Sequence, residues 1–130
     1  MTNSVRILIV DDNWEDLLLF RILVNRYAET YPDDELSVDE VASAEEALNQ
    51  LKLTTYDLVL MDQKMPRVSG SQALQMIRNA VLPSQPPVVS YSNCGRSVLT
   101  SEAQLSGFSA VVTKYMNVGE LHDMLRLVAR

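Results

Sequence analysis

Short runs of aliphatic and β-branched residues alternate along the chain with longer segments in which apolar residues recur at helical spacing. This alternation is typical of a parallel sheet whose strands are connected by crossover helices. The pattern therefore predicts an α/β fold with five strands and five helices. The expected strands span about 5–10, 36–41, 57–61, 88–91 and 110–113, and the expected helices span about 13–29, 43–53, 69–77, 97–105 and 117–128.

Local signals support several of these boundaries. Ser43 precedes Glu46 by three positions, which is the spacing of a capping box, and Asn117 is placed to cap the last helix. Apolar and polar residues alternate over 36–41, as they do in a half-exposed edge strand. The fourth helix has the weakest pattern because serine and threonine are poor helix formers, and Gly107 is expected to end it.

The length and the composition indicate one domain, spanning residues 1–130. A chain of 130 residues with 47% hydrophobic residues can bury a single sizeable core and has no room for a second folded module. The first residues lack the features of a signal peptide, and no apolar stretch approaches the roughly 20 residues needed to span a membrane. We therefore expect a soluble, cytoplasmic protein without membrane association. A single cysteine, Cys94, fits a reducing compartment.

The charge balance argues against nucleic acid as a direct partner. Eleven basic and seventeen acidic residues give a net charge of −6. Neither half of the chain has a cluster of lysine or arginine that could follow a phosphate backbone. If the protein controls transcription, we expect it to act through another protein.

Acidic residues follow two of the expected strands directly. Asp11 and Asp12 end the apolar run 5–10, and Asp62 follows the apolar run 58–61. The carboxyl ends of parallel strands meet at one edge of a sheet, where ligands bind, and acids gathered there repel one another unless a cation joins them. Because carboxylate and carbonyl oxygens suit Mg²⁺, the three acids predict a magnesium site.

Each of these acids also has a simpler interpretation. Asp11 and Asp12 could cap the first helix, where acidic residues favour the helix dipole. A lone aspartate in the position of Asp62 is typical of a turn or of a helix cap. We favour the metal site because three neighbouring acids without a neutralising cation would be costly.

Two further polar residues follow expected strands. Ser92 comes after the fourth strand and Lys114 after the fifth. Taken singly, each is an ordinary polar strand end that meets water. Together they offer a hydroxyl and a cation opposite the acids, which is what a phosphoryl group needs on the oxygens that a metal does not cover.

The stretch from Asp62 to Gly70 is the most specific motif, with Met65 and Pro66 at the third and fourth places after the aspartate and glycine at the eighth. Together with the acidic pair, the serine and the lysine in this order, it resembles the CheY-like receiver domain of two-component response regulators over essentially the whole chain. The resemblance implies a flavodoxin-like, doubly wound five-stranded parallel sheet with strand order 2-1-3-4-5.

The resemblance also implies a role for each acid. Asp62 would take a phosphoryl group from a phosphohistidine. Asp12 would bind Mg²⁺ directly, and Asp11 would act through water. Lys64, two positions after the acceptor, would supply its backbone carbonyl to the metal.

Ser92 and Lys114 would complete the site. The family's hydroxyl residue contacts the phosphoryl group, and its lysine pairs with the acids before phosphorylation and with the phosphate afterwards. The phosphohistidine is expected to come from a partner, either a sensor histidine kinase or a histidine phosphotransfer protein, because His122 falls in the last helix, away from the site. The output would be binding to a downstream protein through the fourth helix, the fifth strand and the fifth helix.

Three positions depart from the family's pattern. Val111 stands where an aromatic residue usually couples the hydroxyl residue to the partner surface. Tyr115 stands where a proline in a cis peptide usually follows the lysine, and Asn93 replaces a smaller residue. Because a cis bond without proline costs roughly 2.5 to 4 kcal/mol, we expect the Lys114–Tyr115 peptide to be trans.

Three functions are therefore compared. The favoured one is a single-domain response regulator that catalyses at most its own phosphorylation and dephosphorylation. The departures favour the first alternative, a pseudo-receiver that binds proteins without phosphorylation. The second alternative is a phosphatase resembling the haloacid dehalogenases, but these enzymes carry a second aspartate where this chain has Lys64, and they need a larger scaffold. Whether the 130 residues belong to a longer protein stays open.

Overall fold

The computed structural model describes residues 3–93 and 107–129. Its centre is a five-stranded parallel sheet in the order β2-β1-β3-β4-β5. This confirms the expected doubly wound, flavodoxin-like topology. The strands are β1 (Asn3–Val10), β2 (Asp34–Val41), β3 (Leu58–Asp62), β4 (Val88–Ser92) and β5 (Ala110–Thr113).

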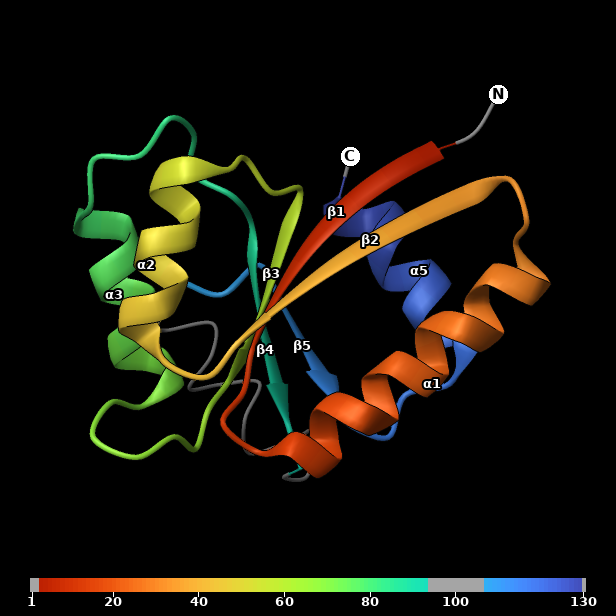
Figure 1. Ribbon diagram of the computed structural model, residues 1–130, viewed down its shortest axis with the longest axis horizontal. Coiled ribbons are helices and arrows are strands. Elements are labelled where there is room, and N and C mark those ends of the chain that lie inside the picture. Colours follow the sequence, from red (N-terminus) through yellow and green to blue (C-terminus); the bar gives the residue numbers. More distant parts are fainter. Residues whose placement is uncertain (1–2, 94–106, 130) are drawn as a thin grey trace.

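Helices cover both faces of the sheet (Figure 1). The described helices are α1 (Trp14–Thr30), α2 (Ala44–Leu53), α3 (Gly70–Asn79) and α5 (Val118–Val128). α1 and α5 pack on one face, and α2 and α3 pack on the other. None of the described helices combines the length and the apolar character that crossing a membrane requires. The helix predicted over 97–105 lies outside the described residues.

The adjacent strands β3 and β4 are buried along their whole length, which explains why four of the five residues of β3 are aliphatic or methionine. Every residue of β3 and of β4 is buried. In β3, Leu58 and Leu60 pack against the core beneath α1 and α5, whereas Val59 and Met61 pack against the core beneath α2 and α3. Alternate side chains of a strand point to opposite faces, so a sheet covered on both faces needs apolar residues at both.

The predicted caps form and set the helix starts. Ser43 Oγ accepts a hydrogen bond from the Glu46 backbone nitrogen at 3.2 Å, and Asn117 Oδ1 accepts one from the Glu120 nitrogen at 2.8 Å. Each bond satisfies a backbone donor that has no partner within its helix. β2 lies at the edge of the sheet, as its alternating pattern predicts.

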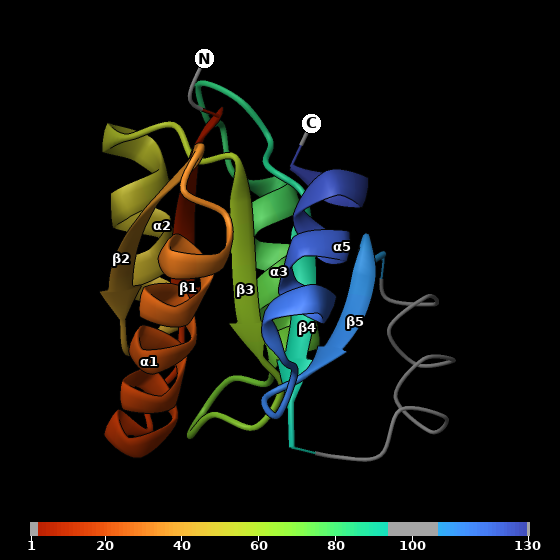
Figure 2. The ribbon, with the colours of Figure 1, turned by 90° about the vertical axis from the view of Figure 1, so that its right-hand side faces the viewer.

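β1 and β2 each begin two residues earlier than predicted, and the carboxyl ends of two other strands lie one residue later than predicted. Asp62 and Ser92 are the last residues of β3 and β4 and still belong to the sheet, where Asp62 pairs with Tyr91. Asp57, predicted to begin the third strand, precedes β3 instead, and its carboxylate accepts a hydrogen bond from the Arg6 nitrogen at 2.8 Å. Figure 2 shows the strand arrowheads pointing to one edge of the sheet, so these ends lie together.

A polar and aromatic cluster lies at the opposite end of the sheet, between α1 and α5. The Tyr27 hydroxyl bonds to the carboxylate of Asp34 and lies 3.0 Å from His122 Nδ1. The His122 ring stacks on Tyr31, with ring centroids 4.0 Å apart. His122 is therefore half-buried in helix packing, far from the acids at the carboxyl edge.

Candidate functional site

A cleft of about 320 Å³ opens at the carboxyl edge of the sheet. Strand ends contribute one part of its wall, and the start of α1 and the loop after β3 contribute the rest. The lining residues are Asp12, Asn13, Asp16, Asp62, Lys64, Ser92, Asn93 and Lys114. Every residue predicted for the site lines this cleft except Asp11, which is completely buried beside it.

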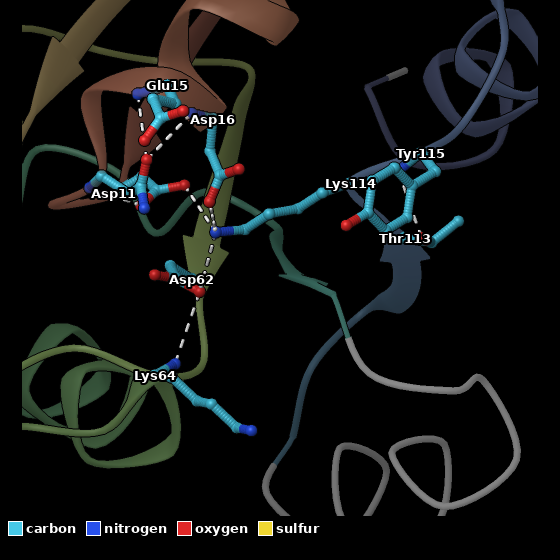
Figure 3. Close-up of polar contacts among 9 residues, drawn as sticks. Asp11, Glu15, Asp16, Asp62, Lys64, Thr113, Lys114 and Tyr115 are labelled. Atoms are coloured by element: carbon cyan, nitrogen blue, oxygen red, sulfur yellow. Dashed lines mark hydrogen bonds and ion pairs between the residues drawn. The ribbon is translucent and has the colours of Figure 1, made fainter.

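The side chain of Lys114 reaches from the end of β5 to three carboxylates (Figure 3). Its Nζ atom lies 2.7 Å from Asp11 Oδ2, 2.7 Å from Asp16 Oδ2 and 3.3 Å from Asp62 Oδ1. The side chain of Lys114 is only 4% exposed. Because an ammonium group has three N–H donors, each carboxylate can accept one of them.

The Lys114 side chain also has an aromatic neighbour and a fixed backbone. Nζ lies 5.4 Å from the centroid of the Tyr91 ring, a cation–π distance. The Lys114 backbone nitrogen donates to the Ser92 carbonyl at 3.0 Å, which joins the ends of β4 and β5. The lysine and the serine are thus positioned by the same pair of strands.

Asn13, rather than the acidic pair, caps α1. Its Oδ1 accepts from the backbone nitrogens of Glu15 and Asp16 at 2.9 and 3.1 Å, and its own nitrogen donates to Asp11 Oδ1 at 2.9 Å. The capping interpretation of Asp11 and Asp12 is therefore wrong in its simple form. Asp11 orients the residue that caps the helix, and neither aspartate is the N-cap.

Asp16 is a site residue that the sequence reasoning missed. It belongs to the first turn of α1, inside the helix expected over 13–29, and was not among the predicted site residues. The available signal was its position: the helix starts at the carboxyl edge of the sheet, so a polar residue in its first turn can face the cleft. The ion pair with Lys114 spans 98 residues and follows only from the tertiary fold, which brings the first turn of α1 within reach of the long side chain that follows β5.

Asp11, Asp12 and Asp62 form the acidic cluster that the sequence predicted. One carboxylate oxygen from each lies within 4.8 Å of the others. Asp12 is exposed, whereas Asp11 is completely buried and already bonds to Lys114. This oxygen-only donor set with one accessible carboxylate suits a hard cation such as Mg²⁺. Lys64 follows in the loop, and its backbone nitrogen lies 3.4 Å from Asp62 Oδ1.

The surroundings of Asp62 oppose its negative charge. Burial, together with the nearby charge of Asp11, raises its pKa to about 6 against the opposing effect of Lys114. Burial alone would lower the pKa of Lys114, but its hydrogen bonds to Asp11 and Asp16 outweigh this and raise it above its usual value. The lysine is therefore a permanent cation beside a carboxylate that a further cation would stabilise.

A comparison with known families identifies the chain. The sequence model described as "Response regulator receiver domain" matches residues 7–126. The chain belongs to this family. Receiver domains act in two-component signalling as signalling modules rather than as free-standing enzymes.

Curated relatives contain the receiver as one part of a longer protein. The chain is 27% identical over 122 residues to the autoinducer 2 sensor kinase/phosphatase LuxQ of Vibrio vulnificus, covering 94% of this chain and 13% of the relative. It is 30% identical over 128 residues to a protein-glutamate methylesterase/protein-glutamine glutaminase of Trichodesmium erythraeum, covering 96% of this chain and 34% of the relative. The chain thus spans 13% and 34% of the lengths of these two proteins.

Solved structures share the fold. A CheY-like response regulator receiver domain from Methylobacillus flagellatus has a TM-score of 0.76 at 22% identity, covering 97% of this chain and 99% of the other. The receiver domain of a sensor histidine kinase from Pseudomonas aeruginosa has a TM-score of 0.78 at 20% identity, covering 98% of this chain and 99% of the other. The latter structure contains a magnesium ion coordinated in its active site cleft.

The three residues that depart from the usual receiver pattern, Val111, Tyr115 and Asn93, all lie within the described part of the chain. The described residues contain no cis peptide bond, so the Lys114–Tyr115 peptide is trans, as predicted. The Tyr115 side chain is exposed, and Val111 packs partly buried against the core beneath α2 and α3. Asn93 is exposed at the cleft. Cys94 lies outside the described residues.

Proposed function

We propose that this receiver is a single-domain response regulator that accepts a phosphoryl group on Asp62 and signals through altered protein binding. The donor would be a phosphohistidine of a sensor histidine kinase or of a histidine phosphotransfer protein, and the reaction would depend on Mg²⁺. Membership of the receiver family supports transfer from a histidine kinase.

One observation carries the proposal. The Asp62 carboxylate lies at an open cleft, within reach of the buried Lys114 ammonium and of the carboxylate oxygens of Asp11 and Asp12. An acid used only to cap a helix or to shape a turn would not need a buried cation and two further acids around it. A phosphoryl acceptor needs this arrangement, because catalysis of phosphoryl transfer depends mainly on positioning and on charge stabilisation.

Asp62 would act as the nucleophile. Its Oδ1 atom is near the Lys114 ammonium and the Lys64 nitrogen, which leaves the other oxygen to attack phosphorus. One O–P bond forms as the P–N bond to the donor imidazole breaks, and the electron pair of that bond stays on the imidazole. Ser92, buried at the end of β4, and Lys114 would contact the phosphoryl oxygens.

The acidic cluster would hold the metal. Asp12 and Asp62, the backbone carbonyl of Lys64, and Asp11 through water are the candidate ligands. Bound Mg²⁺ would neutralise the acids and stabilise the charge of the transferring group. The chain's own contribution is to keep the carboxylates close together before the cation arrives.

Incubation with acetyl phosphate and Mg²⁺, followed by intact-mass measurement, tests the proposal. The wild type should gain the mass of one phosphoryl group, and hydroxylamine, which cleaves acyl phosphates, should remove it. Asp62→Asn should gain nothing. Asp123→Asn, which alters an exposed acid of α5, is the matched control and should be labelled like the wild type.

The pseudo-receiver remains the competing function because Val111, Tyr115 and Asn93 depart from the usual pattern. A folded wild type that gains no mass with acetyl phosphate, and none with a phosphorylated histidine phosphotransfer protein, would favour it. If Asp62→Asn still gains the mass of a phosphoryl group, another residue is the acceptor.

A further inference from the structure

Asp16 contacts the site lysine although no part of the receiver motif points to it. Its Oδ2 atom lies 2.7 Å from Lys114 Nζ, as close as Asp11 and closer than Asp62 at 3.3 Å. The side chain of Asp16 is 15% exposed and lines the cleft together with Asp62 and Ser92. The lysine is thus held at the α1 side of the cleft by a residue outside the predicted set.

The backbone of Asp16 is held by a closed series of contacts. Asp11 accepts from the Asn13 nitrogen, Asn13 caps α1 by accepting from the Asp16 nitrogen, and Lys114 joins Asp16 back to Asp11. The backbone of Asp16 is therefore tied to the acid that also anchors the lysine. Because the backbone is held by the helix and its cap, the contact with the ammonium has to order only the short side chain of Asp16.

Building on the proposed phosphoryl transfer, we propose that Asp16 is a positioning residue that competes with a phosphoryl group on Asp62 for the Lys114 ammonium. The ammonium has three N–H donors and lies within ion-pair distance of three carboxylates. To bond a phosphoryl oxygen, the lysine must weaken one of these contacts. Asp11 is completely buried, whereas Asp16 borders the cleft, so the Asp16 contact is the one that lies beside the new anion.

The charge of Asp16 acts in the same direction. A phosphoryl group on Asp62 places additional negative charge in the cleft that Asp16 lines. Like charges at short range in a partly buried site repel more strongly than they would in water. Asp16 therefore favours the unphosphorylated protein both by holding the lysine and by repelling the phosphoryl group.

Binding of beryllofluoride, a mimic of the phosphoryl group, tests this at saturating Mg²⁺, with the bound signal followed by ¹⁹F NMR. Asp16→Asn keeps the shape of the side chain but removes its charge. Its affinity for beryllofluoride should rise roughly tenfold over the wild type, the factor that corresponds to one charged hydrogen bond. Glu15→Gln is the matched control because it removes an exposed charge from the same helical turn, and it should stay within about twofold of the wild type.

The direction of the change separates competition from a merely structural role. Damage to the site would weaken beryllofluoride binding, whereas loss of a competitor strengthens it. The inference is overturned if Asp16→Asn binds beryllofluoride no more tightly than Glu15→Gln does, or less tightly than the wild type does. Either result would leave Asp62 as the acceptor. A folded wild type that binds no beryllofluoride overturns the proposed function and this inference together.

Discussion

A β-carbon on Gly70 would lie 2.6 Å from the carbonyl oxygen of Asp62. The first residue of α3 thus touches the last residue of β3, and the Gly70 nitrogen donates to the Gln63 carbonyl at 3.0 Å. The glycine eight places after the acceptor is required by this close approach. Its backbone does not have a positive φ angle, so the requirement comes from space rather than from conformational freedom.

Gly70→Ala should therefore lower the free energy of unfolding by roughly 1–3 kcal/mol, the usual cost of forcing extra volume into a packed region. Helix propensity alone predicts the opposite, a gain of up to about 1 kcal/mol. Urea unfolding followed by circular dichroism measures the difference. The methyl group meets backbone atoms of Asp62 and Gln63, which cannot rotate away as a side chain can.

Gly119→Ala is the matched control in the first turn of α5. Its added β-carbon would meet only Asn117 Oδ1, at 3.4 Å, which is close to ordinary van der Waals contact. This variant should be as stable as the wild type or more stable by up to about 1 kcal/mol. Equal effects of the two substitutions would show that the contact with Asp62 is not the cause.

Asp62→Asn should be more stable than the wild type above about pH 6 in the presence of a chelator. Burial raises the pKa of Asp62 from 3.8 to about 6, so the folded protein binds this proton more tightly than the unfolded chain does. The free energy of unfolding of the wild type therefore falls as the pH rises from about 4 to 6. The variant does not lose this stability because asparagine does not titrate. We expect a difference on the order of 1–2 kcal/mol at pH 7, absent near pH 4.

Mg²⁺ provides the control for this pH dependence. If the cation binds the ionised carboxylate, it should stabilise the wild type above pH 6 more than it stabilises Asp62→Asn. A stability gap between the two proteins that is constant from pH 4 to 8 would contradict a shifted pKa as its origin.

Mg²⁺ binding should depend on Asp12. The side chain is exposed at the cleft, and Trp14, also exposed, begins α1 two residues later. Titration of Mg²⁺ followed by tryptophan fluorescence should saturate, and Asp12→Ala should weaken the affinity by a factor on the order of 100 or more. Glu15→Gln, a change in an exposed acid beside Trp14, should alter the affinity only slightly. Equal affinities of Asp12→Ala and the wild type would remove Asp12 from the metal site.

Tyr27→Phe should destabilise the protein at neutral pH by about 1 kcal/mol. The Tyr27 hydroxyl, with a smaller contribution from the Asn3 amide, lowers the pKa of Asp34 below its usual value. A carboxyl with a lowered pKa stabilises the folded state above its unfolded pKa, and this contribution is lost as the pH falls through the folded pKa. The difference between variant and wild type should thus shrink in acid, as urea unfolding at pH 7 and pH 3 would measure.

Tyr31→Phe is the comparison for Tyr27→Phe. Tyr31 stacks on His122, and the structure gives its hydroxyl no hydrogen bond to any residue within 3–93 or 107–129. Removing this hydroxyl should leave the stability and its pH dependence unchanged. If both variants lose the same stability, ring packing rather than the Asp34 bond is responsible.

The hydrophobic pattern predicted the sheet because burial on two faces requires apolar residues at nearly every position. β3 and β4 are buried throughout, and their runs were recognised within one residue at each end. The caps at Ser43 and Asn117 were predicted because a short polar side chain satisfies backbone donors of its own turn. Strand ends were less certain because ladder pairing, as between Asp62 and Tyr91, depends on the neighbouring strand.

The sequence by itself determined the fold, the strand that carries the acceptor and the residue types at the carboxyl edge, because these follow from local periodicity and from motif spacing. Only the tertiary structure decided the partners of Lys114. The first turn of α1 and the end of β5 meet at the carboxyl edge of the sheet, which brings Asp16 to the ammonium across 98 residues, and no local pattern encodes that meeting. It also showed that the Asn13 side chain caps α1, while Asp11 Oδ1 accepts from the Asn13 nitrogen and Asp11 Oδ2 forms an ion pair with the distant lysine.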